Sequence, residues 1–149
     1  MSARFYEQEV SAKLKNRRAL SAYLDRLIMD RQPGVGKVSL TYIFCSDEYL
    51  HGINLQFLQH DDYTDIITFD LSEPAGTRPA ARSEIRGEIY ISTERVAENA
   101  AKFKTTYDRE LHRVIFHGAL HLCGLRDKKP AEQKAMRSAE EAALSGWYA

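Results

Sequence analysis

The chain has 149 residues, of which 44% are aliphatic or aromatic, and this composition suits one folded domain over residues 1–149 rather than a disordered chain. Lys plus Arg and Asp plus Glu both number 21, so the formal net charge is zero and any contact with nucleic acid must come from a local basic patch. There is no apolar run of membrane-spanning or signal-peptide length, and the two cysteines, Cys45 and Cys123, suit free thiols, so we expect a cytoplasmic protein with no membrane contact.

The first third of the chain predicts a helix, a strand and a second helix. Apolar residues recur at mostly helical spacing over residues 10–30, with Ser11 as a candidate N-cap. Residues 37–45 follow a break rich in Pro and Gly and alternate apolar with polar side chains, which predicts a strand. Residues 46–58 then predict a second helix, capped at one of its first two residues.

The middle of the chain predicts two strands separated by a loop. Residues 64–71 and 84–92 have the alternation and the β-branched content of strands. Between them, residues 72–84 are rich in Pro, Gly, Ala and Arg, and a solvated hairpin loop is favoured over a binding lid. Thr64 and Asp65, which begin the first of these strands, are interpreted as a turn cap rather than as catalytic residues.

The last part of the chain predicts three helices. They cover residues 92–103, 107–124 and 130–147, and the last begins at Pro130 and ends near Gly146. Hairpin-forming strands followed by clustered helices indicate an α+β fold. We predict a small mixed β-sheet of about four strands packed against several helices.

One stretch of the second of these late helices, HGALHLCGLRD over residues 117–127, predicts a metal site. His117 and His121 are four residues apart, so their imidazoles share one face of the helix. Gly124 stands where a left-handed conformation ends a helix, and the turn can bring Asp127 back toward the histidines. We therefore predict one divalent ion, zinc, held by His117, His121 and Asp127, with an open position for catalysis. The same donors also admit nickel, iron or manganese.

The residue after the first histidine separates this stretch from the zinc proteases. Those enzymes carry a glutamate there that serves as general base, whereas this chain carries Gly118. No carboxylate replaces it nearby in the sequence. A peptidase of that type would lack its base, and the group that handles the proton stays open.

These motifs, taken in order, resemble those of the YbeY proteins, a family of rRNA-maturation endoribonucleases. The family signature runs His-Gly-x-Leu-His-Leu-x-Gly-Tyr-Asp-His. The segments TDIITFD (residues 64–70) and GEIYIS (residues 87–92) resemble the family's Thr-Asp-Val-Leu-Ser-Phe segment and its Gly-Asp-Ile strand. The resemblance covers roughly residues 38–144, and the signature matches at His117, Gly118, Leu120, His121, Leu122 and Gly124.

The chain departs from the family pattern at three places. Asp127 stands where the family has its third histidine, and Leu125-Arg126 replaces a Tyr-Asp pair. Leu58 replaces an arginine that is thought to act in RNA cleavage. Arg113 lies one turn before His117 and is a candidate replacement, able to hold a phosphate or to stabilise the charge that builds up during cleavage, although a solvated arginine explains it equally well.

The resemblance implies a metal-dependent single-strand endoribonuclease that acts in 16S rRNA 3′-end maturation and in ribosome assembly or quality control. Its implied partners are small-subunit rRNA or the immature ribosome, a small-subunit ribosomal protein and a ribosome-assembly GTPase. Two alternatives stay open: a non-catalytic ribosome-assembly factor with a structural metal, and a metallohydrolase of another substrate class. We predict Arg113 and His117 as the catalytic residues. Basic candidates for phosphate contact are Arg109, Arg113, Arg126, Lys128 and Lys129, with Lys102 and Lys104 extending the patch.

Overall fold

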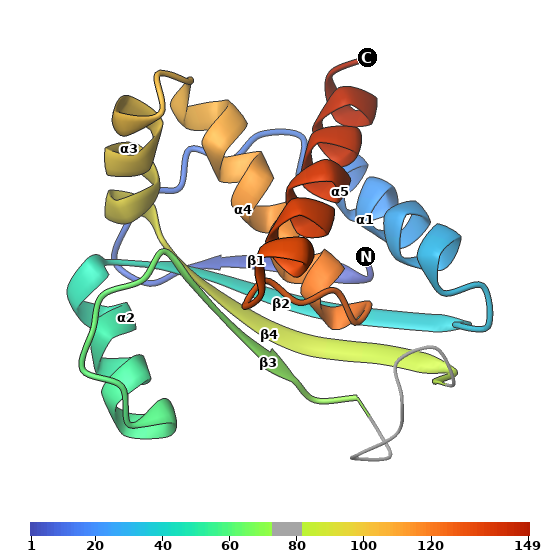
Figure 1. Cartoon of the computed structure of the whole chain (residues 1–149), viewed down its shortest axis with the longest axis horizontal. Helices are drawn as coiled ribbons and strands as arrows, with labels where there is room; N and C mark the ends of the chain where they lie inside the picture. Colours follow the sequence, from blue (N-terminus) through green and yellow to red (C-terminus); the bar gives the residue numbers. More distant parts are fainter. Residues whose placement is uncertain (73–81) are drawn as a thin grey trace.

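The centre of the fold is a mixed β-sheet (Figure 1). The computed structural model describes residues 1–72 and 82–149, and within them the sheet has four strands in the order β1-β2-β4-β3. β1 and β4 run parallel to β2 on its two sides, and β3 pairs antiparallel with β4 at one edge. The strands are β1 (Ala3–Glu7), β2 (Lys37–Cys45), β3 (Ile66–Asp70) and β4 (Glu84–Ser92).

The helices cover the sheet unequally. α1, α4 and α5 lie over one face, while α2 lies beside the opposite face near one end (Figure 1). This arrangement confirms the predicted α+β fold with a small mixed sheet under several helices. The helices are α1 (Arg17–Arg31), α2 (Asp47–Ile53) with the π-helical turn η1 (Asn54–Leu58), α3 (Thr93–Lys102), α4 (Tyr107–Leu122) and α5 (Pro130–Tyr148).

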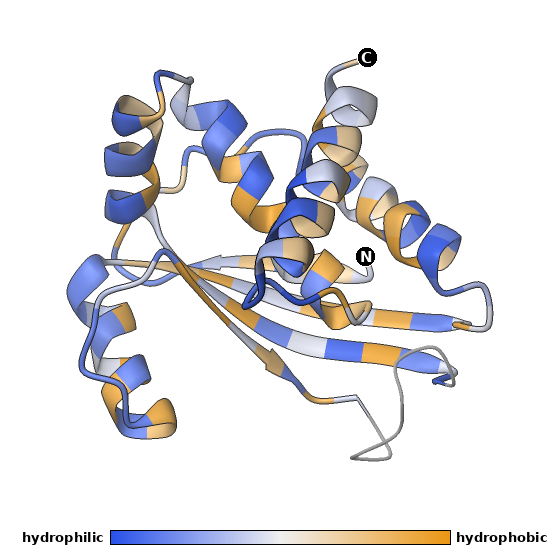
Figure 2. Cartoon of the chain, viewed as in Figure 1, coloured by the Kyte–Doolittle hydropathy of each residue, from blue (hydrophilic) through white to orange (hydrophobic). Residues whose placement is uncertain are grey.

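The alternation of the two central strands creates the main core. In β2 and β4 every second residue is buried in the main core, and Figure 2 shows the apolar residues of these strands as orange bands. The buried Tyr42 on β2 donates a 2.8 Å hydrogen bond from its hydroxyl to the carbonyl of Ile115 on α4. Because this bond is buried, it fixes α4 above the sheet at a residue two positions before the predicted ligand His117.

The predicted start of the N-terminal helix was wrong. Residues 10–16 are not helical, and α1 begins after Asn16 instead of near Ser11. Lys13 and Asn16 have φ of 55° and 57°, in the left-handed region that an α-helix cannot contain. The apolar residues of this segment still pack into the core, although the segment is irregular. Leu14 is buried, and Val10 is partly buried against the same cluster.

The strand β1 is an element that the sequence pattern did not predict. It has only five residues, and just Ala3 and Phe5 point into the core. A pattern this short does not stand out among charged neighbours. The later elements agree with the predictions: Ser92 caps α3 and α5 begins at Pro130, although α5 continues past Gly146 to Tyr148. Most of the predicted loop over residues 72–84 lies outside the described residues.

None of the helices within the described ranges is both long and apolar enough to cross a lipid bilayer.

Candidate metal centre

The predicted ligands line a cavity of about 370 Å³ between α4, the N-terminal end of β3 and the loop that joins α4 to α5. His117, His121 and Asp127 all line this cavity, and Arg113 lines it as well. Several of the other lining residues come from the segment that enters β3. The full lining is Thr64, Asp65, Ile66, Thr68, Arg113, Val114, His117, His121 and Asp127.

The end of α4 explains how Asp127 comes back to the histidines. Gly124 has φ of 101°, a conformation that strains any L-residue with a side chain. Its N–H donates to the carbonyl of His121, and the N–H of Leu125 donates to the carbonyl of Leu120, which is the paired hydrogen-bond pattern of a Schellman C-cap. Leu125 then packs beside Leu120 and α5. The predicted left-handed role of Gly124 is confirmed, and the turn it makes sends the chain back past the helix end.

The imidazole of His117 is held from both sides. Its Nδ1 lies 2.6 Å from Oε2 of Glu140 on α5, and its Nε2 lies 3.5 Å from Oδ2 of Asp127. A carboxylate accepts a hydrogen bond, so Nδ1 carries the proton and Nε2 of a neutral ring presents a lone pair toward Asp127. Two such atoms at this distance can be joined by a proton on Nε2 or by a bound cation. A separation of roughly 3.4 Å is expected for two ligands of a tetrahedral ion with bonds of about 2.0–2.1 Å.

His121 lines the same cavity but is exposed. In residues 1–72 and 82–149, no group of three His, Cys, Asp or Glu side chains stands ready to hold a metal ion. The fold thus brings His117 and Asp127 face to face and leaves His121 at the mouth of the cavity, on the next turn of α4. The three-ligand set that the sequence predicts stays a prediction.

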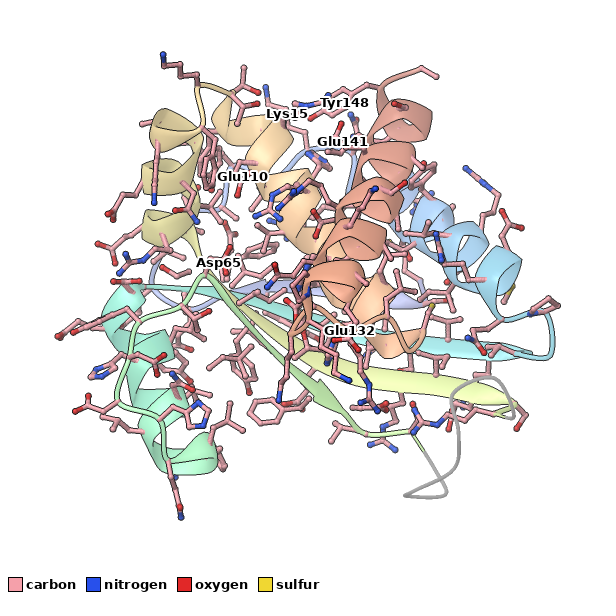
Figure 3. The ribbon with its side chains drawn as sticks, viewed as in Figure 1. Lys15, Asp65, Glu110, Glu132, Glu141 and Tyr148 are labelled. Atoms are coloured by element: carbon pink, nitrogen blue, oxygen red, sulfur yellow. The ribbon has the colours of Figure 1, made fainter. Side chains whose placement is uncertain are left out.

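A buried charge network lies behind the cavity. Arg113 donates from Nε and Nη2 to the two oxygens of Glu110, at 2.9 and 2.7 Å, and from Nη1 to Oε1 of Glu140 at 3.2 Å. Its Nη2 also lies 3.6 Å from Oδ2 of Asp65. Figure 3 shows Asp65 at the start of β3 and Glu110 farther up on α4. Glu110 and Glu140 are almost fully buried, so the guanidinium is what makes their burial tolerable.

This network changes the interpretation of Arg113. Burial opposes its charge, but the hydrogen bonds and charge of Glu110, with Glu140 and Asp65, raise the pKa of the guanidinium above its ordinary value. A permanently charged Arg113 that already holds two carboxylates has few N–H groups left for a phosphate. It does line the cavity, so its catalytic role stays a prediction.

The electrostatic balance of the site fits a cation. Asp65, Asp127, Glu110 and Glu140 supply four carboxylates, against the one guanidinium of the network. The carboxylates outnumber this guanidinium, and this excess of negative charge favours a divalent ion. The donor chemistry, the facing atoms of His117 and Asp127 and this excess together fit the predicted ion.

Gly118 stands where the zinc proteases carry their glutamate base, and close packing against the sheet explains why this position has no side chain. A Cβ atom built on it would lie 3.0 Å from Cγ2 of Ile89 and 3.2 Å from Cδ1 of Ile66. The backbone of α4 therefore approaches the sheet closely at this residue, and a carboxylate there would be forced toward the core instead of into the cavity.

His112, the third histidine of α4, and Cys123, which follows α4, do not line the cavity. His112 is buried, its Nδ1 lies 2.7 Å from the carbonyl of Asp108 and its ring stacks on Trp147. Cys123 is a buried free thiol. The placement of Cys123 agrees with the free thiol that the sequence predicts.

The basic candidates lie at different distances from the cavity. Arg109 pairs with Glu141 of α5 on the surface. Arg126, Lys128 and Lys129 are exposed in the loop that carries Asp127. Leu58, at the position of the family's arginine, is an exposed residue of η1. Among the candidates placed here, Arg126, Lys128 and Lys129 form a basic rim on the α4–α5 loop side of the cavity.

Sequence reasoning missed three carboxylates of the site. Glu110 precedes Arg113 by three residues, a spacing that permits an ion pair on one helix face and was available as a signal. Glu140 is one of two adjacent glutamates in a helix of amphipathic pattern, and nothing in that pattern marks it as a partner of His117. Asp65 was interpreted as a cap, yet its side chain lines the cavity.

Comparison with known proteins gives a consistent result. A family model described as "Endoribonuclease YbeY" matches residues 5–148. Proteins named endoribonuclease YbeY are similar over almost the whole chain: that of Flavobacterium johnsoniae is 41% identical over 143 residues, covering 96% of this chain and 94% of the relative. That of Christiangramia forsetii is 48% identical over 119 residues, covering 80% and 76%. The solution structure of TM1509 from Thermotoga maritima superposes with a TM-score of 0.57 and 25% identity, covering 98% of this chain and 91% of that one.

Proposed function

Because the chain belongs to the endoribonuclease YbeY family, we propose that it is a metal-dependent endoribonuclease that cleaves single-stranded RNA. The observation that carries the proposal is the pair formed by His117 and Asp127, whose Nε2 and Oδ2 lie 3.5 Å apart in a negatively charged cavity. His117, His121 and Asp127 would hold the ion. The proposal requires the exposed His121 side chain, which lines the same cavity, to turn toward the other two.

The chemistry that a divalent ion supplies in such a place is activation of water or polarisation of a phosphoryl oxygen. The chain's own residues orient the donors and meet the substrate. Glu140 keeps the Nε2 lone pair of His117 directed into the cavity. Thr64 and Thr68 line the wall. The hydroxyl of Thr68 can donate to a phosphate or ribose oxygen, whereas that of Thr64 donates to the carbonyl of Ile66 at 3.3 Å. Asp65 is the lining carboxylate that lies outside the predicted ligand set, which makes it the candidate proton acceptor.

The substrate and setting follow from the family resemblance. We propose that the RNA is the 3′ end of precursor 16S rRNA on the immature small subunit, in the cytoplasm, with a small-subunit ribosomal protein and a ribosome-assembly GTPase as partners. The exposed Arg126, Lys128 and Lys129 beside Asp127 support contact with a phosphate backbone at the rim. Zinc is the proposed ion because two imidazoles and one carboxylate are donors that it prefers.

One observation favours a second candidate. Leu58 takes the place of the arginine that the family resemblance associates with RNA cleavage, and Arg113 is already committed to two buried carboxylates. If neither position supplies a cation to the cleaved phosphate, cleavage is expected to be slow or absent. The second candidate is therefore a ribosome-assembly factor in which the ion braces the turn after α4.

One assay separates the two candidates. The zinc-loaded protein and its His117→Ala variant are incubated with a precursor 16S rRNA fragment and with a peptide control, and binding to small subunits is measured in parallel. Zinc-dependent RNA cleavage that disappears in the variant supports the nuclease. No cleavage by the unmodified protein, with retained binding to the subunit, supports the assembly factor, and cleavage of the peptide contradicts both.

A further inference from the structure

We infer that Glu140 is a positioning residue of the metal site: it fixes His117 in the tautomer that carries its proton on Nδ1, so that Nε2 is always available to a cation. The inference rests on the proposed metal site but not on the proposed RNA substrate. It assigns a function to a residue of α5 that lies 23 positions beyond His117 in the chain.

The first part of the argument is the contact itself. Oε2 of Glu140 lies 2.6 Å from Nδ1 of His117, which is a short hydrogen bond to a charged acceptor. Glu140 is 4% exposed, so water does not compete for this oxygen. An imidazole that is free in solution exchanges its proton between both nitrogens, whereas one facing a fixed carboxylate keeps the proton on that side.

The second part is that Glu140 is itself immobilised. Its other oxygen, Oε1, accepts a 3.2 Å hydrogen bond from Nη1 of Arg113. Arg113 is in turn held by both oxygens of the buried Glu110. The chain Glu110–Arg113–Glu140–His117 thus ties the imidazole through three successive side-chain contacts to the body of α4 and α5.

The third part is the direction in which the imidazole points. With Nδ1 turned toward α5, Nε2 faces Oδ2 of Asp127 and the cavity. Loss of the Glu140 carboxylate would allow the proton to move to Nε2, where it blocks coordination, and would free the ring to rotate. Groups that orient a metal-ligating histidine in this way typically contribute a factor of roughly 10–100 to metal affinity.

The test measures the tautomer and the metal affinity separately. Histidine labelled with ¹⁵N is incorporated into the full-length metal-free protein, and long-range ¹H–¹⁵N spectra report which ring nitrogen of His117 is protonated. The signal is assigned by its absence in His117→Ala. Zinc affinity is then measured by competition with a chromophoric chelator.

The variants are Glu140→Ala and Glu140→Gln, with Glu141→Ala as the matched control. Glu141 is the adjacent glutamate, but it pairs with Arg109 on the surface and does not touch His117. We expect the control to keep the Nδ1-protonated form and its zinc affinity. We expect Glu140→Ala to populate the other tautomer and to bind zinc roughly 10–100-fold more weakly. Glu140→Gln keeps an oxygen acceptor of the same size and should lie between the two.

The outcomes separate this inference from the proposed function. An unchanged tautomer, or a zinc affinity equal to that of the control, in both Glu140 variants overturns the inference even where the unmodified protein cleaves RNA. A changed tautomer with weakened zinc binding supports it even where no RNA is cleaved. Should Glu140→Ala fail to fold, the isosteric Glu140→Gln variant decides the question by the same two measurements.

Discussion

His117 and Asp127 face each other across the turn that follows α4, with Nε2 and Oδ2 3.5 Å apart. They are ten positions apart in the chain, and the left-handed Gly124 between them makes this meeting possible. From the spacing and the turn at Gly124, the sequence predicts both as ligands of one metal ion. Their facing electron-rich atoms are the reason to expect that removing either one weakens cation binding.

The first prediction concerns the third ligand. Asp127→Ala removes the oxygen that faces His117, and we expect zinc affinity to fall by at least about 100-fold, since a direct ligand counts for more than an orienting group. Asp127→His introduces the residue that the family signature carries here, and its zinc affinity should stay within tenfold of the unmodified protein, a difference of about 1.4 kcal/mol. Chelator competition measures both. Equal affinity of Asp127→Ala and the unmodified protein would remove Asp127 from the site.

The second prediction concerns the guanidinium of the buried network. Arg113→Met leaves Glu110 and Glu140 without their cation, and we expect a loss of about 2–4 kcal/mol in the free energy of unfolding, because uncompensated buried carboxylates are costly. Urea denaturation followed by circular dichroism measures it. The control is Arg109→Met, which breaks an exposed pair with Glu141 and should cost less than about 1 kcal/mol. A similar small loss in both variants would contradict a structural role for Arg113.

The third prediction concerns the turn after α4. Gly124→Ala forces a side chain into a φ of 101°, and we expect it to cost about 1–2 kcal/mol of stability and to lower zinc affinity by displacing Asp127. Gly52→Ala is the control, because Gly52 lies in α2 without a positive φ, and a Cβ added to it would meet nothing within 4 Å. That variant should be neutral or slightly stabilising. Thermal unfolding measures the stability and chelator competition measures the zinc affinity. Equal changes in the Gly124 and Gly52 variants would refute the prediction.

The fourth prediction concerns Gly118, which stands where the zinc proteases carry their glutamate base. Gly118→Glu drives a carboxylate against Ile89 and Ile66, and we expect a loss of at least about 3 kcal/mol in the free energy of unfolding without any gain of peptidase activity. Urea denaturation and a peptide hydrolysis assay check the two parts. A stable variant that hydrolyses peptides would show that the cavity, and not the sheet, receives this side chain.

The fifth prediction concerns the two thiols. Burial, assisted by the charge of Asp47, raises the pKa of Cys45 to about 12, and burial raises the pKa of Cys123 to about 11 despite the opposing charge of Arg31. Because both values are raised, at pH 8 only about one thiol in a thousand or fewer is the reactive thiolate. We expect no labelling of the folded protein by iodoacetamide at this pH and complete labelling in urea. Mass spectrometry distinguishes the two results.

The sequence was sufficient for the elements that have long, regular patterns. The apolar stripe of α4, the alternation of β2 and β4 and the capping residue of α3 each follow from local chemistry, and each is confirmed. β1 and the start of α1 were not predictable in the same way. The first owes its form to pairing with a distant strand. The second is set by left-handed backbone at Lys13 and Asn16, and of these two residues only asparagine has a local preference for that conformation.

For the site, the sequence could name the groups on one helix and its following turn but not those that arrive from elsewhere. His117, His121 and Asp127 are linked by spacing. Glu140 reaches His117 only because α5 packs back along α4, and Asp65 enters because β3 begins beside the same helix. Contacts of this kind depend on how elements pack, which no local pattern encodes.

The position of Glu140 on α5 also sets a limit on when the site exists during biosynthesis. A ribosome makes α4 before α5, so His117 emerges while its partner is still untranslated. Until α5 has been made and has docked, the imidazole is free to hold its proton on either nitrogen. A nascent chain that ends at Asp127 therefore contains all three predicted ligands. It still lacks Glu140, the carboxylate that fixes the proton position of His117.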